Sequence, residues 1–115
     1  MQDLLIQIND HCGWDCQITA FDGWKLMLSS GSSDVHVKPL AELAGVSFMS
    51  CPMAFSHPMF RLGDASERQR ISAVVPLEPS DLLLAIEAET MAGLQRQVFY
   101  ILAESLTLAP AWKEQ

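Results

Sequence analysis

The chain has 115 residues, of which 50% are hydrophobic and 18% are charged, and its 14 acidic residues outnumber its 7 lysines and arginines. This length suits one domain, residues 1–115, which can bury about two-thirds of the surface of the unfolded chain. The net charge of −7 opposes binding to nucleic acid and to anionic lipid head groups, because both are bound mainly through Lys and Arg. We therefore expect no nucleic-acid partner and no membrane partner.

The first residues carry no secretion signal, since residues 1–3 lack a positive charge and the apolar run at 4–6 is short. The longest uncharged stretch, residues 43–60, is interrupted by two prolines and a glycine, which break a membrane-spanning helix. Three cysteines are an odd number, so reduced thiols are expected rather than a disulfide framework. These features predict a cytoplasmic protein.

A short amphipathic helix is predicted at the N-terminus, where Asp3 can cap its start and Gly13 can end it in the left-handed conformation. Its apolar stripe follows offsets of one, four, seven and eight residues. The stripe consists of Leu4, Leu5, Ile8, His11 and Cys12.

The strongest hairpin signal is the Asp22-Gly23 turn between two apolar segments. A two-residue turn would place Ile18 opposite Met27 and split the apolar residues between two faces. A three-residue loop with Gly23 in a left-handed bulge position instead keeps them on one face, and we prefer it. This register pairs Ala20 with Trp24, Ile18 with Leu26 and Cys16 with Leu28, and it places Trp24 in the core.

Further elements follow from the positions of the prolines. Residues 35–37 alternate and predict an edge strand stopped by Pro39, and residues 46–51 predict a strand ended by Pro52. Residues 52–58 are expected to form a loop against the body. A capping-box pattern, Ser66 with Gln69, predicts a short helix near 66–72.

Residues 80–108 fit either one long helix or two strands joined by a hairpin. Ser80 and the Ala, Leu, Glu and Gln content favour the helix. The alternation at 82–88, the break at Gly93 and the β-favouring run at 98–101 favour the strands, which we prefer. The predicted fold is α+β, a mainly antiparallel, curled β-sheet (a roll or partial barrel) with a short N-terminal helix.

Four residues could be drawn together as a zinc site: Cys12, Cys16, Cys51 and His57. The two-residue spacing typical of zinc ligands is absent, so we interpret the cysteines as core residues and expect no metal or other cofactor. A nucleophilic Cys51 with His57 has no local signature either. Glu87 and Glu89 share a strand face and indicate a charge pattern rather than an acid–base pair. The sequence leaves an enzymatic role open and supports none.

Large aromatic residues beside polar turns often anchor a protein partner. Trp14, which is flanked by Gly13 and Asp15, and Trp112, near the C-terminal end of the chain, are the candidates for exposed positions. The predicted partner-binding residues are therefore Trp14, Asp15 and Trp112.

Two segments, AGVSFMSCP at 44–52 and FYILAESLT at 99–107, resemble small, mostly β proteins of bacterial toxin–immunity loci. The resemblance covers about a fifth of the chain, and Ala44 stands where an aromatic residue usually precedes the Gly-Val pair. It implies a non-enzymatic protein that masks the surface of a toxin, often a basic nuclease. No functional residue can be carried over.

The sequence thus predicts a non-catalytic, acidic binding protein, of the bacterial immunity or inhibitor type, whose carboxylates steer it to a basic protein partner. The alternative is a small ligand-binding or enzymatic β-roll domain with an apolar cavity, which could be a homodimer.

Overall fold

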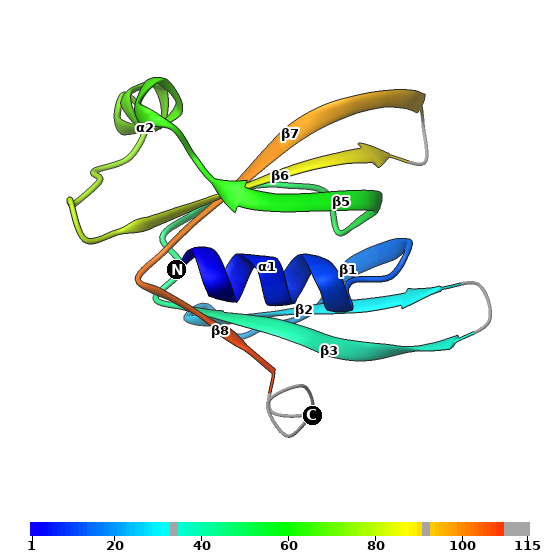
Figure 1. Ribbon diagram of the computed structural model, residues 1–115. Coiled ribbons are helices and arrows are strands. Elements are labelled where there is room, and N and C mark those ends of the chain that lie inside the picture. Colours follow the sequence, from blue (N-terminus) through cyan, green and yellow to red (C-terminus); the bar gives the residue numbers. More distant parts are fainter. Residues whose placement is uncertain (33–34, 91–92, 110–115) are drawn as a thin grey trace.

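The computed structural model describes residues 1–32, 35–90 and 93–109, and it has two helices and eight strands in an α+β arrangement (Figure 1). The elements in chain order are α1 (Gln2–His11), β1 (Asp15–Phe21), β2 (Lys25–Ser32), β3 (Val35–Ala44), β4 (Phe48–Ser50), β5 (Ala54–Leu62), α2 (Ala65–Ser72), β6 (Leu82–Thr90), β7 (Gly93–Ala103) and β8 (Ser105–Leu108). No helix among the described residues is both long and apolar enough to cross a bilayer.

All eight strands belong to one antiparallel sheet with the order β4-β7-β6-β5-β1-β2-β3-β8. Only Glu104 separates β7 from β8, so one continuous segment pairs with β6 and β4 in its first part and with β3 in its second. The antiparallel sheet and the N-terminal helix are confirmed. The sheet is neither closed nor strongly curled, so the expected roll or partial barrel was wrong.

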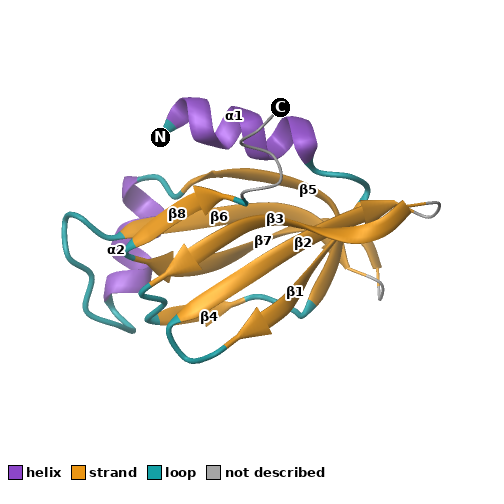
Figure 2. Ribbon diagram, turned by 90° about the horizontal axis from the view of Figure 1, so that it is seen from below, coloured by secondary structure: helices purple, strands orange, loops and turns teal. Residues whose placement is uncertain are grey.

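Helix α1 covers one face of the sheet, as Figure 2 shows, and buries Leu5 and Ile8 against it. The side chain of Asn9 fixes the helix on β5, because it donates to the carbonyl oxygen of Phe60 at 2.9 Å and accepts the Phe60 N–H at 2.8 Å. In the hydrophobic cluster that includes Leu5 and Ile8, the largest fully buried strand residues are Leu26, Leu28, Leu40, Leu43, Phe55, Phe60, Leu84, Ile86 and Ile101. Burial of this apolar face is the main source of stability.

The helix termini differ from the prediction. Met1, not Asp3, occupies the N-cap position, and it makes no side-chain cap hydrogen bond. The helix ends at Cys12 with extended backbone rather than at a left-handed Gly13. Gly13 is needed for another reason, since a Cβ there would lie 2.5 Å from the carbonyl oxygen of Gly31 on β2.

Gly23 has the expected positive φ, of 94°, but the connection between β1 and β2 comprises residues 22–24 and not residues 21–23, which the pairing of Ala20 with Trp24 implied. The expected register was wrong, because Phe21 pairs with Leu26 and Ile18 pairs with Leu28. The register shifts between Ile18 and Ala20, where β1 has one more residue than β2. Ile18 therefore still lies on the buried face together with Leu26 and Leu28. Trp24 lies in the loop and is exposed, which corrects its assignment to the core.

Proline marks strand ends less strictly than expected. Strand β3 continues through Pro39, which pairs with Ser29 and lies outside the stretch that pairs with β8. Residues 54–58 belong to β5 rather than to a loop, and Pro58 falls where the register between β5 and β6 shifts. Strand β4 is shorter than predicted, at Phe48–Ser50. The hairpin of β6 and β7 is confirmed, and the long helix is excluded.

Helix α2 lies near the predicted place but has a different capping box, formed by Asp64 and Glu67 rather than Ser66 and Gln69. The helix packs Ile71 against the second face of the sheet, beside Leu83 and Leu102. This second face is therefore covered at one end, as the position of α2 in Figure 1 shows.

Glu67 joins α2 to the sheet through a buried carboxylate. Arg61 on β5 donates two hydrogen bonds to it, at 2.6 and 3.1 Å, and the hydroxyl of Tyr100 on β7 donates another. The backbone N–H of Asp64 donates at 2.9 Å. The hydrogen bonds from Arg61 are the main cause that lowers the pKa of Glu67 to about 2.

We predict that Glu67→Gln lowers the free energy of unfolding by about 2 kcal/mol, because the neutral amide loses charge-assisted hydrogen bonds to Arg61. The native pKa lies below the ordinary value of 4.5, so this contribution is present above pH 4.5 and is lost as the pH falls toward 2. Urea unfolding at several pH values measures it. Glu78→Gln, at an exposed position, is the control and should stay within about 0.5 kcal/mol. A Glu67→Gln protein with wild-type stability at neutral pH would contradict the prediction.

Candidate functional site

The end of strand β1 extends beyond its neighbour β5. Strand β5 pairs with β1 only at Asp15, Cys16 and Gln17, and one further backbone hydrogen bond joins the Ile18 N–H to the carbonyl oxygen of Met53 at 2.8 Å. Beyond Ile18, the described residues provide β1 with no backbone hydrogen bond to a strand other than β2. Residues 19–21 therefore form an open strand edge.

Large apolar side chains are exposed around this edge. Phe21 is 46% exposed, Trp24 in the adjoining loop is 53% exposed, and Met53 at the end of the β4–β5 connection is 63% exposed. We call this region the hairpin-end surface and define it by Ala20, Phe21, Trp24, Met27, Met49 and Met53. Two surface hollows share Ala20 and Phe21 in their linings and so adjoin at the end of β1.

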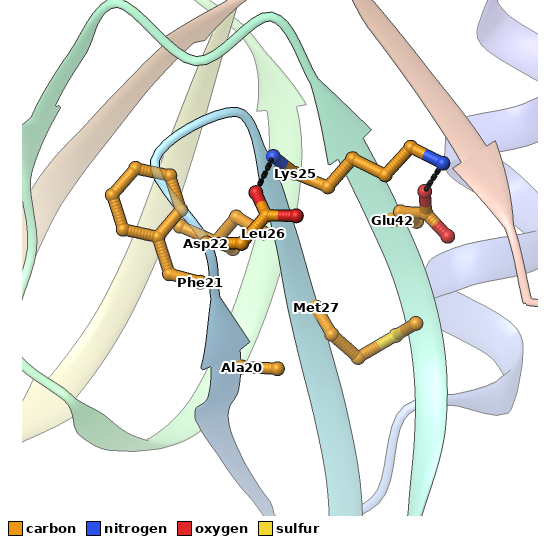
Figure 3. A pocket seen from close by; sticks show the side chains of 7 residues that line it. All are labelled: Ala20, Phe21, Asp22, Lys25, Leu26, Met27 and Glu42. Atoms are coloured by element: carbon orange, nitrogen blue, oxygen red, sulfur yellow. Dashed lines mark hydrogen bonds and ion pairs between the residues drawn. The ribbon is translucent and has the colours of Figure 1, made fainter.

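The first hollow has a volume of about 310 Å³ and lies over the β1–β2 hairpin (Figure 3). Ala20, Lys25 and Met27 are among the residues that line it. The Lys25 ammonium forms an ion pair with the Glu42 carboxylate on β3, at 3.6 Å. Asp22 closes the loop by accepting the N–H groups of Trp24 and Lys25, at 2.9 and 2.7 Å. These backbone hydrogen bonds lower the pKa of Asp22, so its negative charge is fixed at the rim.

The second hollow, of about 280 Å³, lies on the open edge of β1 and is more apolar in composition. Its lining comes from β1, from β4 and from the connection between β4 and β5: Ile18, Thr19, Ala20, Phe21, Met49 and Met53. Two methionines beside an aromatic ring give an adaptable apolar surface of the kind found where proteins bind several side-chain shapes.

Of the residues predicted to bind a partner, Trp14 and Asp15 lie together and are exposed. Trp14 is 65% exposed and its ring centroid lies 5.8 Å from that of His57, while Asp15 accepts a hydrogen bond from the Ser56 hydroxyl at 3.2 Å. His57 adopts φ 50° and donates its N–H to the carbonyl oxygen of Trp14 at 2.6 Å. Trp112 lies outside the described residues.

The structure does not assemble the metal site that the sequence allowed. Among residues 1–32, 35–90 and 93–109, no group of three or more His, Cys, Asp or Glu side chains is arranged to hold a metal ion. The Nδ1 atom of His57 instead lies 3.1 Å from a carboxylate oxygen of Glu89. Cys16 is buried in the core and Cys51 packs against it, and burial raises the pKa of the Cys51 thiol to about 12.

Glu87 and Glu89 have structural partners. Glu87 accepts a hydrogen bond from Arg61 at 2.6 Å, and Glu89 lies 3.5 Å from Arg96 across the β6–β7 pair. The hairpin-end surface was not predicted from the sequence, because Trp24 was assigned to the core. The signal that could have indicated this surface is the pair of aromatic residues, Phe21 and Trp24, on the two sides of a turn.

Comparisons of the chain with protein-family models, with curated proteins and with solved structures gave no match. The function must therefore be inferred from the surface itself.

We predict that Phe21→Ala changes the free energy of unfolding by less than about 1 kcal/mol, because the ring is nearly half exposed. Phe55→Ala, at a core position on β5, should cost about 3 to 5 kcal/mol through the cavity it leaves. Thermal or urea unfolding of both variants measures the difference. If both variants lost similar stability, Phe21 would be part of the packed core and not of a binding surface.

Proposed function

We propose that this protein is a non-catalytic binding module that holds a partner protein on the hairpin-end surface. The observation that carries the proposal is the exposure of Phe21, Trp24 and Met53 around a strand edge that no other described strand covers. Aromatic and methionine side chains are enriched at the centres of protein interfaces, where they contribute most of the binding energy.

The charge distribution supports a basic partner. Three of the described cations form ion pairs within the molecule: Lys25 with Glu42, Arg61 with Glu67 and Glu87, and Arg96 with Glu89. Two more donate to uncharged groups, Arg68 to backbone carbonyls and Arg70 to Tyr100. With an overall charge of −7, the unneutralised surface charge is therefore mainly negative, which speeds association with a positively charged protein.

The occupant that fits the surface best is an extended apolar segment of such a partner. An extended chain can lie along residues 19–21, form backbone hydrogen bonds to the open edge, and place alternate side chains into the two hollows. This mode of binding would suit an immunity or inhibitor protein that masks a basic toxin, the class that the sequence resembles.

The test compares wild-type protein with Phe21→Ser/Trp24→Ser as baits in lysate of the source organism, followed by titration of the purified partner. The wild type should retain a basic protein, and the double variant should bind it at least about thirtyfold more weakly, since two interface anchors are lost. Raising the ionic strength should also weaken the complex, because the charged surfaces are screened.

A matched control is Met59→Ser, which removes an exposed apolar side chain on β5, away from the residues that define the surface. It should leave the affinity unchanged. The proposal is wrong if the double variant binds as tightly as the wild type, or if only a second copy of this chain is retained and the assembly is insensitive to Phe21 and Trp24.

A further inference from the structure

The turn between α1 and β1 is fixed by one hydroxyl group, that of Ser30 on β2. Its oxygen accepts the Gly13 N–H at 2.6 Å, and the hydroxyl lies 3.2 Å from the carbonyl oxygen of Asp15 and 3.5 Å from the sulfur of Cys12. The close approach of Gly13 to the Gly31 carbonyl holds the same turn against β2. The sulfur of Cys12 is therefore held beside Ser30.

Cys16 reaches the same place from the sheet. It is paired directly with Ser30 in the β1–β2 register, and directly opposed residues of antiparallel strands have their Cβ atoms about 4.5 to 5.5 Å apart. Cys16 belongs to the buried core, and Cys12 packs against that core. Cys12 from the end of α1 and Cys16 from β1 therefore converge on Ser30, and the fold brings two of the three cysteines to the same place in the core.

The two thiols have unequal environments. Cys12 is partly accessible, and the neighbouring Cys16 thiol and the Ser30 hydroxyl lower its pKa. Cys16 is only 1% exposed, and the neighbouring Cys12 together with burial raises its pKa. An accessible thiol that ionises more readily beside a buried thiol is the arrangement of an attacking cysteine and a resolving cysteine.

We propose that Cys12 and Cys16 form an oxidisable dithiol site that reacts with low-molecular-weight disulfides and closes into an intramolecular disulfide. The thiolate of Cys12 attacks one sulfur of a disulfide such as oxidised glutathione, which forms a mixed disulfide and releases one glutathione thiolate. The Cys16 thiol then gives up its proton and attacks the Cys12 sulfur, which forms the Cys12–Cys16 bond and expels the second glutathione. Two thiol protons leave, and one external disulfide is reduced to two thiols.

This reaction would tie the end of α1 to the start of β1. The site is independent of the hairpin-end surface and does not rest on the proposed partner. Cys51 is the competing partner for a disulfide, because it packs against the same core cluster that contains Cys16.

The test exposes the folded, reduced protein to oxidised glutathione and follows its mass. Wild-type protein and Cys51→Ser should each lose two hydrogen atoms and retain no glutathione. Cleavage before aspartate separates Cys12 from Cys16 at Asp15, so the two peptides should stay joined until a reductant is added.

Variants of the resolving thiol give the diagnostic result. In Cys16→Ser, and in Cys16→Ala should the serine variant fail to fold, Cys12 should accumulate one glutathione that the wild type does not keep. In Cys12→Ser, no adduct should form on the buried Cys16. The proposal is overturned if the wild type keeps glutathione on Cys12, if Cys12 and Cys16 both stay reduced, or if the recovered disulfide joins either of them to Cys51.

Discussion

The interface between β5 and β1 determines what the rest of this molecule can do. Their pairing stops after Gln17, whereas β1 continues to Phe21 alongside β2 alone. On the paired part, Cys16 lies beside Phe55 and is buried. On the part beyond Gln17, Phe21 is opposite the fully buried Leu26, yet none of the strands that the structure describes lies on its other side, and its ring is exposed. Because β5 does not extend alongside the end of β1, a side chain of β1 that shares a face with core residues is exposed there.

The rest of the fold stabilises the sheet that carries the open end of β1. Helix α1 covers the face that carries Leu26 and Leu28, and the Asn9 side chain fixes the helix on β5. Glu67 holds α2 at the other face through Arg61 and Tyr100. The packed parts of the sheet are therefore fixed on both faces, and a rigid scaffold that presents exposed anchors reduces the entropy lost on binding.

Much of the fold could be predicted from local pattern, because the relevant signals act over a few residues. The N-terminal helix, the turn at Gly23 and the strands β6 and β7 follow from apolar spacing and turn chemistry. The errors arose where pairing with distant strands overrides a local signal. Pro58 is tolerated in β5 because the register shifts there, and the open edge at the end of β1 depends on where β5 begins, at Ala54. The convergence of Cys12 and Cys16 likewise depends on Ser30, which lies on the neighbouring strand β2.

The most direct measurement of the central claim is amide hydrogen exchange of this protein, alone and saturated with its purified partner. The account predicts that binding slows exchange at residues 18–21 and 24–27 and around Met49 and Met53, whereas α1 and the Trp14–His57 contact keep their exchange rates. Protection confined to α1, or to Trp14 and the neighbouring part of β5, would contradict the assignment of the hairpin-end surface as the place where the partner binds.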